Sequence, residues 1–320
     1  MTFGGVGIWE KIGKTQQHEV NALMKEVADA GINFIDTANV YSLGESEKLL
    51  GQSIKELGLH RNEIVIATKV KGRMKEKPNS VGLSRYHIFG SVDESLQRLK
   101  MDHVDILYVH GVDLRTPVGE TMHSLNDIVN TGKVRYIAVC NWPAWMVMKA
   151  QGIADKHGWH KFIGLQYYYS LATRDIEREI LPLASDQHLG VMPWSPLAGG
   201  FLSGKYTRNS QKAGDSRRDE FDFPIIDKEK TYDIVDVVAQ VAKEHKVSAA
   251  EIALAWVRQR PGITSTIIGA KKMEQLKENI HSVDIQFSPD QLKRIEEVSA
   301  LKTEYPEWMT AFQGGNRQAK

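Results

Sequence analysis

The stretch Gly31–Tyr41, GINFIDTANVY, sets a pattern that the rest of this 320-residue chain repeats. Its β-branched and aromatic residues, from Ile32 to Ile35, predict a buried strand, and the run stops at a charged residue, Asp36. A short polar turn then leads to the phenol of Tyr41. A carboxylate at a strand end and a phenol on the next loop indicate the floor of an active site.

Short and nearly continuous apolar runs recur along the chain, as expected of strands buried on both faces of a parallel sheet. They span Ile32–Asp36, Ile64–Lys69, Val104–His110, Val134–Asn141, Phe162–Gln166, Gly190–Trp194 and Thr264–Gly269. Helical patterns lie between them, over Thr15–Ala30, Ser46–Leu57, Arg85–Leu99, Val118–Asn130, Trp145–His157, Arg174–Gln187 and Ser248–Arg260. This alternation predicts seven βα units, one short of a closed (β/α)8 barrel.

Two α/β architectures compete at this point. A doubly wound sheet usually carries G-x-G-x-x-G after its first strand, and this sequence has no such motif. Polar residues instead end several predicted strands, namely Asp36, Lys69, His110, Asn141, Gln166 and Trp194. Because a barrel assembles its active site from many strand ends, we predict a (β/α)8 TIM barrel that forms a single domain over residues 1–320.

Three segments decorate the predicted barrel. Lys71–Ser84 and Gly199–Pro224 are loop insertions, and the second is long enough to be a lid or a binding loop. After residue 288 we expect one helix, Pro289–Ser299, and then a loose tail that carries Trp308.

The composition excludes several classes of protein. A hydrophobic content of 42% and a charged content of 25% are those of an ordinary soluble globular domain. The net charge of +1 gives no reason to expect nucleic acid or an anionic membrane as a partner. The single cysteine, Cys140, rules out an internal disulfide and fits a reducing compartment. The sequence shows neither a membrane-spanning run nor a signal-peptide core, so we expect a cytoplasmic protein.

Taken singly, the candidate residues have ordinary explanations. Lys69 could be the exit of a strand to solvent, Asp36 a helix N-cap or turn former, and Tyr41 a packed aromatic ring. His110 is a stronger candidate for a functional residue, because an imidazole at a buried strand end needs a hydrogen-bond partner or a catalytic role.

Together, the same four residues predict one chemical device. A phenol with a pKa of about 10 is a poor proton donor at neutral pH. A nearby ammonium lowers that pKa, and a carboxylate holds the ammonium in place. A histidine can then orient a carbonyl group or share in the proton transfer. The expected chemistry is protonation of a carbonyl oxygen as hydride reaches its carbon.

An ordered set of motifs also carries a family resemblance. The segments FIDTANVY, ATKV, DILYVHGVD, YIAVCNW, IGLQYYYS, MPWSPLAGGFLSGKY and IIGAKKMEQLKENI resemble the aldo-keto reductase superfamily, in particular the bacterial and fungal branch related to the potassium-channel β-subunits. The resemblance covers about residues 3–300. It implies NADP(H)-dependent reduction of aldehydes or ketones, or the reverse reaction, with Tyr41 as general acid/base assisted by Asp36, Lys69 and His110.

The resemblance further implies a cofactor site and a substrate pocket. The cofactor would contact Asp36, Cys140, Asn141, Gln166, Trp194, Ser195, Pro196, Leu197, Ala198, Gly199, Lys205, Gly269, Lys271, Gln275, Glu278 and Asn279. A helix that begins after Gly269, with Lys271 and Lys272, would attract a 2′-phosphate and so favour NADPH over NADH. Trp9, Trp142 and the Gly199–Pro224 loop would wall the pocket, and the tail would cap it.

The chain departs from the family pattern in three places. Cys140 replaces a serine that would bond the carboxamide, and His110 is kept where the channel β-subunits have asparagine, which favours turnover. The third departure is at Met1, where the printed chain opens at the end of the family's first barrel strand. We therefore expect this strand and the preceding hairpin to be missing, which leaves a gap in the barrel.

Other functions stay open. The protein could be a nicotinamide-cofactor-binding redox sensor or regulatory subunit, or a Schiff-base aldolase that uses Lys69. The segment Gly199–Tyr206, GGFLSGKY, nearly matches a phosphate-binding loop, but Tyr206 stands where a small hydroxyl is needed. The eleven histidines form no metal-binding motif, so we predict no metal. The expected partner is a small carbonyl compound or alcohol, and the chain is free to oligomerise.

Overall fold

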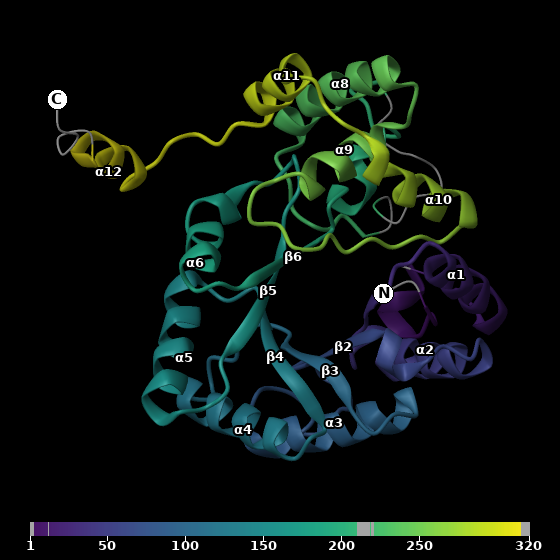
Figure 1. Cartoon of the computed structure of the whole chain (residues 1–320), viewed down its shortest axis with the longest axis vertical. Helices are drawn as coiled ribbons and strands as arrows, with labels where there is room; N and C mark the ends of the chain where they lie inside the picture. Colours follow the sequence, from purple (N-terminus) through teal and green to yellow (C-terminus); the bar gives the residue numbers. More distant parts are fainter. Residues whose placement is uncertain (1–2, 12, 210–217, 219–220, 315–320) are drawn as a thin grey trace.

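A curled parallel sheet with the strand order β1-β2-β3-β4-β5-β6 forms the centre of the protein (Figure 1). The computed structural model describes residues 3–11, 13–209, 218 and 221–314. The strands are β1 (Phe34–Asp36), β2 (Val65–Val70), β3 (Val104–Val109), β4 (Val134–Cys140), β5 (Phe162–Tyr168) and β6 (Gly190–Trp194). These agree with six of the predicted strands to within two residues at each end.

Helices follow the strands and pack outside the sheet (Figure 1). The α-helices are α1 (Gln17–Asp29), α2 (Glu45–Glu56), α3 (Arg85–Leu99), α4 (Val118–Asn130), α5 (Ala144–His157), α6 (Ile180–Asp186), α8 (Lys228–His245), α9 (Ala249–Arg258), α10 (Met273–His281), α11 (Pro289–Ser299) and α12 (Glu307–Gly314). Short 3-10 helices are η1 (Gly7–Lys11), η2 (Tyr41–Gly44), η3 (Arg61–Glu63), η4 (Asp175–Glu177), η5 (Ala198–Ser203) and η6 (Ser282–Asp284). The predicted helix over 174–187 is divided into η4 and α6, and α8 and α12 are additional helices.

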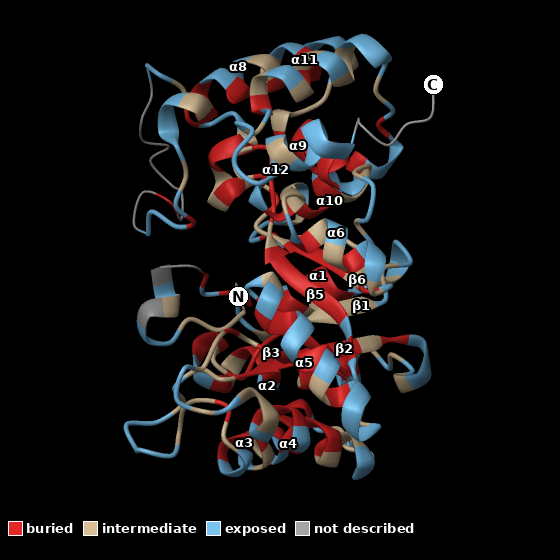
Figure 2. Cartoon of the chain, turned by 90° about the vertical axis from the view of Figure 1, so that its left-hand side faces the viewer, coloured by how far each residue is buried: buried red, intermediate tan, exposed pale blue. Residues whose placement is uncertain are grey.

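Strands β2 to β6 are largely buried, as their apolar sequences predict, whereas the three residues of β1 are half-buried (Figure 2). Ile66 and Leu107 pack into the main core with the outer helices. Their neighbours Ala67 and Tyr108 belong to a second apolar cluster. Because successive side chains of a strand point to opposite faces, this second cluster lies on the inner face of the curled sheet.

The seventh predicted strand, Thr264–Gly269, is not a regular strand, so that expectation was wrong in detail. Its backbone still runs beside β6, since Thr264 N–H donates to Val191 O at 2.9 Å and Ile267 N–H donates to Pro193 O at 3.0 Å. The N–H of Ser265 points at the same Val191 oxygen, at 3.4 Å. Two successive donors on one acceptor break the even spacing of a parallel ladder.

The sheet does not close between β1 and segment 264–269, in agreement with the expected gap. Among the described residues, β2 is the only strand hydrogen-bonded to β1. A cavity of about 550 Å³ lies in this gap and is lined from both sides, by Phe34 and Leu23 and by Ile268 and Leu276. The inner face of the barrel is therefore reached from this side.

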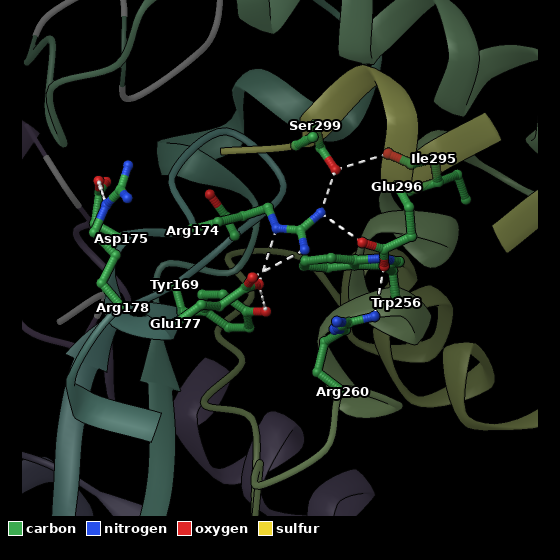
Figure 3. A network of polar contacts seen from close by, with 12 residues as sticks. Tyr169, Arg174, Asp175, Glu177, Arg178, Trp256, Arg260, Ile295, Glu296 and Ser299 are labelled. Atoms are coloured by element: carbon green, nitrogen blue, oxygen red, sulfur yellow. Dashed lines mark hydrogen bonds and ion pairs between the residues drawn. The ribbon is translucent and has the colours of Figure 1, made fainter. Parts of the chain in front are cut away.

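A largely buried ionic network joins the loop after β5 to the C-terminal helices (Figure 3). The guanidinium of Arg174 donates to both oxygens of Glu177 at 2.9 Å, lies 2.7 Å from Glu296 on α11, and donates to Ser299 at 2.9 Å. The indole of Trp256 on α9 donates to the same Glu296 at 3.0 Å. The network fixes α9 and α11 against the sheet.

Helix α12 projects from the body at the end of an extended segment (Figure 1). It buries none of its side chains, and Trp308 is 49% exposed. The tail therefore does not cap the site as the sequence suggested. No helix in the described part of the chain has the length and apolar character that a membrane crossing requires.

Candidate active site

Four predicted catalytic residues come together at one edge of the sheet. Asp36 ends β1, Lys69 is the penultimate residue of β2, and His110 directly follows β3. Lys69 Nζ lies 2.5 Å from Asp36 Oδ2 and 4.9 Å from the centre of the Tyr41 ring. The rings of Tyr41 and His110 meet edge to face, with 5.6 Å between their centres. Parallel strands explain the convergence, because their carboxyl ends share one edge.

The turn after β1 brings Tyr41 back over β2. Asn39 N–H donates to Lys69 O at 3.3 Å, and Tyr41 N–H donates to Ala38 O at 3.1 Å. Ser42, the next residue, has a φ of 49°, in a left-handed conformation uncommon for residues other than glycine. Its hydroxyl accepts from Gly5 N–H at 3.1 Å, so the N-terminal segment holds the turn in place.

Lys69 is a buried ammonium with two oxygen partners. It is fully buried, and it donates to Asp36 and to the carbonyl oxygen of Thr37 at 2.8 Å. Burial by itself lowers the pKa of Lys69, but the charges of Asp36 and Tyr41 outweigh it and leave that pKa raised. A Schiff-base lysine must be neutral to attack a carbonyl, so this ion pair disfavours the aldolase alternative.

Burial governs the pKa of the two proton carriers. It raises the pKa of Tyr41 to about 12, and the opposing charge of Lys69 only reduces this rise. As expected, the charge of Lys69 acts to lower the pKa of Tyr41. The expectation that this pKa is lowered overall was wrong, because burial raises it by more. Burial, with the charges of Lys69 and Lys71, lowers the pKa of His110 to about 3. At neutral pH the phenol is protonated and the imidazole is neutral.

Two predicted cofactor residues lie on the next two strands of the sheet, β4 and β5. Gln166, on β5, donates from Nε2 to Asp36 Oδ1 at 2.8 Å. Cys140, the last residue of β4, is buried, and burial raises the pKa of its thiol, so it is a neutral thiol. Asp36 thus accepts hydrogen bonds from both Lys69 and Gln166.

Trp194 and Asn141 form a second polar contact at the same edge of the sheet. The Trp194 indole N–H donates to Asn141 Oδ1 at 3.0 Å, and Asn141 has a φ of 57°. The indole also stacks on Tyr168 and on Phe223, with ring centres 5.0 and 5.8 Å away. Asn141 is exposed, and its Oδ1 is the atom that Trp194 contacts.

The loop after β6 is tightly curled where the sequence predicts pyrophosphate contacts. Ser195 Oγ accepts from Gly199 N–H at 2.9 Å across Pro196, Leu197 and Ala198. Arg218, which the sequence did not single out, donates to Ala198 O at 2.7 Å and to Pro224 O at 2.8 Å. Its only sequence signal is the charged run that contains it. Residues 210–217, 219 and 220 of the predicted lid lie outside the described residues.

The residues expected at the adenosine end lie where segment 264–269 leads into α10. Lys271 N–H donates to Gln275 Oε1 at 3.1 Å, and Asn279 Nδ2 donates to Gly269 O at 3.5 Å. Lys271 and Glu278 are exposed on the same helical corner, and Lys205 is exposed after η5. The expected helix N-terminus after Gly269 is confirmed by α10.

The two predicted pocket tryptophans differ in position. Trp9, on η1, meets the Tyr41 ring edge to face with 5.2 Å between centres. Trp142 is buried in the main core against Phe162, and in the described part of the chain no ring contact joins it to Tyr41. Trp9 is therefore the better candidate for a pocket wall.

The donor set around Asn141 fits a nicotinamide cofactor. A carboxamide group needs donors and acceptors side by side, and the Asn141 amide, oriented by Trp194, and the Gln166 amide offer both. At the other end, the amino terminus of α10 with two lysines suits a phosphate.

Comparison with known proteins identifies the family of the chain. Residues 1–300 match the model of the Aldo/keto reductase family. The chain is 35% identical to a putative aryl-alcohol dehydrogenase of Schizosaccharomyces pombe, over 93% of this chain and 90% of that protein. It is 35% identical to a probable voltage-gated potassium channel subunit beta of Arabidopsis thaliana, over 94% of each. It is 34% identical to a versiconal hemiacetal acetate reductase of Aspergillus parasiticus, over 91% and 89%. The chain belongs to the aldo/keto reductase family of oxidoreductases.

Proposed function

We propose that the protein is an NADP(H)-dependent carbonyl reductase that converts aldehydes or ketones to alcohols, or catalyses the reverse reaction. The observation that carries this proposal is the buried ion pair of Lys69 and Asp36 under a protonated Tyr41. A charged pair in the protein interior is costly unless it is well bonded or has a function. Here it lies directly beside Tyr41, a phenol whose ring meets the ring of a neutral histidine.

Each residue has a distinct role in this proposal. When bound, NADPH supplies the hydride. The Tyr41 hydroxyl donates its proton to the carbonyl oxygen, and the Lys69 ammonium stabilises the phenolate that remains. Asp36 keeps the ammonium in position and charged. His110, being neutral, donates a hydrogen bond to the same oxygen without competing for its proton.

The proposed cofactor path runs along the carboxyl edge of the sheet. Asn141 and Gln166 would hold the carboxamide, the curled loop Ser195–Gly199 would follow the pyrophosphate, and Lys271 would meet a 2′-phosphate. Trp194 is the proposed stacking platform for the nicotinamide ring. Phe223 now stacks on that indole, so we expect the loop that carries it to shift when the cofactor binds.

Fluorescence titration with NADPH and NADH, followed by an assay with 4-nitrobenzaldehyde, tests the proposal. We expect tighter binding of NADPH and oxidation of NADPH by the aldehyde. Tyr41→Phe should keep the cofactor affinity and lose about 10²-fold or more in kcat, the contribution of a positioned general acid. Full activity of this variant would reject the mechanism.

A redox-sensing role is the second candidate, because a relative that covers 94% of this chain is a probable channel β-subunit. Its expected signature is tight NADPH binding with negligible turnover of every aldehyde tested. The retained His110 favours turnover instead, since it faces the Tyr41 ring.

A further inference from the structure

Lys71 is a second lysine at the edge of the active site. It stands two residues beyond Lys69, where the chain leaves β2, and has a φ of 147°, which side-chain-bearing residues rarely adopt. Its carbonyl oxygen accepts from Gly82 N–H at 2.9 Å, which ties both ends of the loop together. Backbone strain of this kind gathers at functional sites.

The side chain of Lys71 lies over Gly111, the residue after His110. A methyl group placed on Gly111 would lie 3.8 Å from both Cδ and Nζ of Lys71. The Lys71 ammonium therefore lies beside the residue that directly follows His110. The lowered pKa of His110, to which the charge of Lys71 contributes after burial and Lys69, agrees with this proximity.

The charge of Lys71 is not balanced within the site. Lys69 is neutralised by Asp36, and Tyr41 and His110 are uncharged at neutral pH. In the described ranges, Lys71 Nζ has no carboxylate within ion-pair distance. The acidic residue beyond β3, Asp113, accepts instead from the N–H groups of Leu83 and Arg115 and from the Thr116 hydroxyl, at 2.8 to 2.9 Å. Among the residues that the structure describes, the Lys71 ammonium thus has no close counter-ion, and it lies near the proposed proton donors.

We propose that Lys71 determines substrate specificity by binding an anionic group, so that the preferred substrates are aldehydes or ketones that carry a carboxylate or a similar acid. The carbonyl oxygen would lie between Tyr41 and His110, and the acidic group would extend over Gly111 to the ammonium. Charge-assisted hydrogen bonds are about twice as strong as neutral ones, so the lysine adds affinity only for the charged substrates. This inference rests on the proposed carbonyl reductase function.

Matched substrates that differ only in charge test the proposal. The pairs are 3- and 4-carboxybenzaldehyde and their methyl esters, assayed with NADPH. We expect wild-type protein to favour at least one acid over its ester, and Lys71→Met to lower kcat/KM for that acid about tenfold, mainly through KM. The same substitution should change kcat/KM for the ester by less than twofold. Lys71→Arg should retain the preference, and high salt should weaken it.

The matched control is Lys77→Met, because Lys77 is an exposed lysine of the same loop. Lys77→Met should leave kcat/KM unchanged for both the acid and the ester. Equal losses for acid and ester in Lys71→Met, or no preference in wild-type protein, would overturn the proposal. If neither substrate is reduced, the carbonyl reductase function is rejected, and calorimetric titration with 4-methylbenzoate then tests Lys71 alone. In that case, equal affinity of wild-type protein and Lys71→Met for the benzoate would overturn the role of Lys71.

Discussion

Lys69 Nζ lies 2.5 Å from Asp36 Oδ2 inside the sheet, and this contact is the centre of the site. The second oxygen of the same carboxylate accepts from Gln166 on β5. One side chain of β1 therefore contacts both its sheet neighbour β2 and the more distant strand β5. The arrangement makes the chemistry and the local stability depend on the same carboxylate.

Asp36→Asn should be both unstable and inactive. The substitution leaves a fully buried ammonium without its counter-charge, which costs about 3–5 kcal/mol when one partner of a buried pair is lost. Urea unfolding measures the cost, and NADPH oxidation measures the activity. The control is Asp93→Asn, which breaks a surface pair with Lys133 and should cost less than about 1 kcal/mol. Equal stability of the two variants would contradict the prediction.

The pH dependence of stability should show an acid limb and an alkaline limb. The folded pKa of His110 is about 3 against 6.5 for a free imidazole, so the unfolded chain binds the extra proton and stability falls as pH drops from 6.5 toward 3. The folded pKa of Tyr41 is about 12 against 10.0, so its contribution is present below pH 10 and is lost as pH rises through 12. Unfolding curves across pH test both limbs, and His110→Gln should flatten the acid limb alone.

Cofactor preference should depend on the exposed lysine at the start of α10. Lys271→Met is expected to weaken NADPH binding about tenfold and to leave NADH unchanged, since only NADPH has the 2′-phosphate. Lys277→Met removes a lysine from the body of α10, which Lys271 precedes, and should have no effect. Fluorescence titrations of the four combinations decide the point. A parallel loss for NADH would show that Lys271 supports the helix rather than the phosphate.

The network around Arg174 should contribute stability without contributing to turnover. Arg174→Met leaves Glu177 without its bidentate partner and weakens the contacts of Glu296 (Figure 3), so we expect a loss of about 3 kcal/mol. Arg294→Met breaks the more exposed contact with Glu244 and should cost much less, because exposed ion pairs contribute little to stability. The kcat of both variants should equal that of wild-type protein. A large fall in kcat for Arg174→Met would mean that the network also positions the site.

Much of the fold was predictable because buried parallel strands leave a plain sequence pattern. The four catalytic candidates were predictable for the same reason, since each ends or follows such a strand. Helix α8 was missed although its signals are present: Asp227 caps it, accepting from Lys230 N–H, and buried residues recur at Ile234, Val238 and Val241. The irregularity of segment 264–269 was not predictable, because it depends on how two backbones align.

The sequence predicted which residues form the site better than it predicted their pKa values. The sequence gives the neighbours of Tyr41 but not its depth, and depth decides the direction of its pKa shift. The contacts of Arg218 with backbone carbonyls likewise could not be predicted, because every residue has a backbone carbonyl whatever its side chain. Trp142 looked like a pocket wall because of its place after β4, whereas packing places it in the core.

The unclosed sheet also bears on how the protein responds to heat. Backbone hydrogen bonds join Asn33 and Thr37 to β2, so by alternation the backbone groups of Phe34 and Asp36 face the gap instead of a second ladder. Amide protons at such an edge exchange with water through small local openings. Asp36, the proposed anchor of Lys69, thus stands on a strand at the edge of the sheet. On warming, we expect activity to be lost at a lower temperature than that of global unfolding. The reason is that β1, which carries the Asp36 partner of Lys69, should unfold locally first.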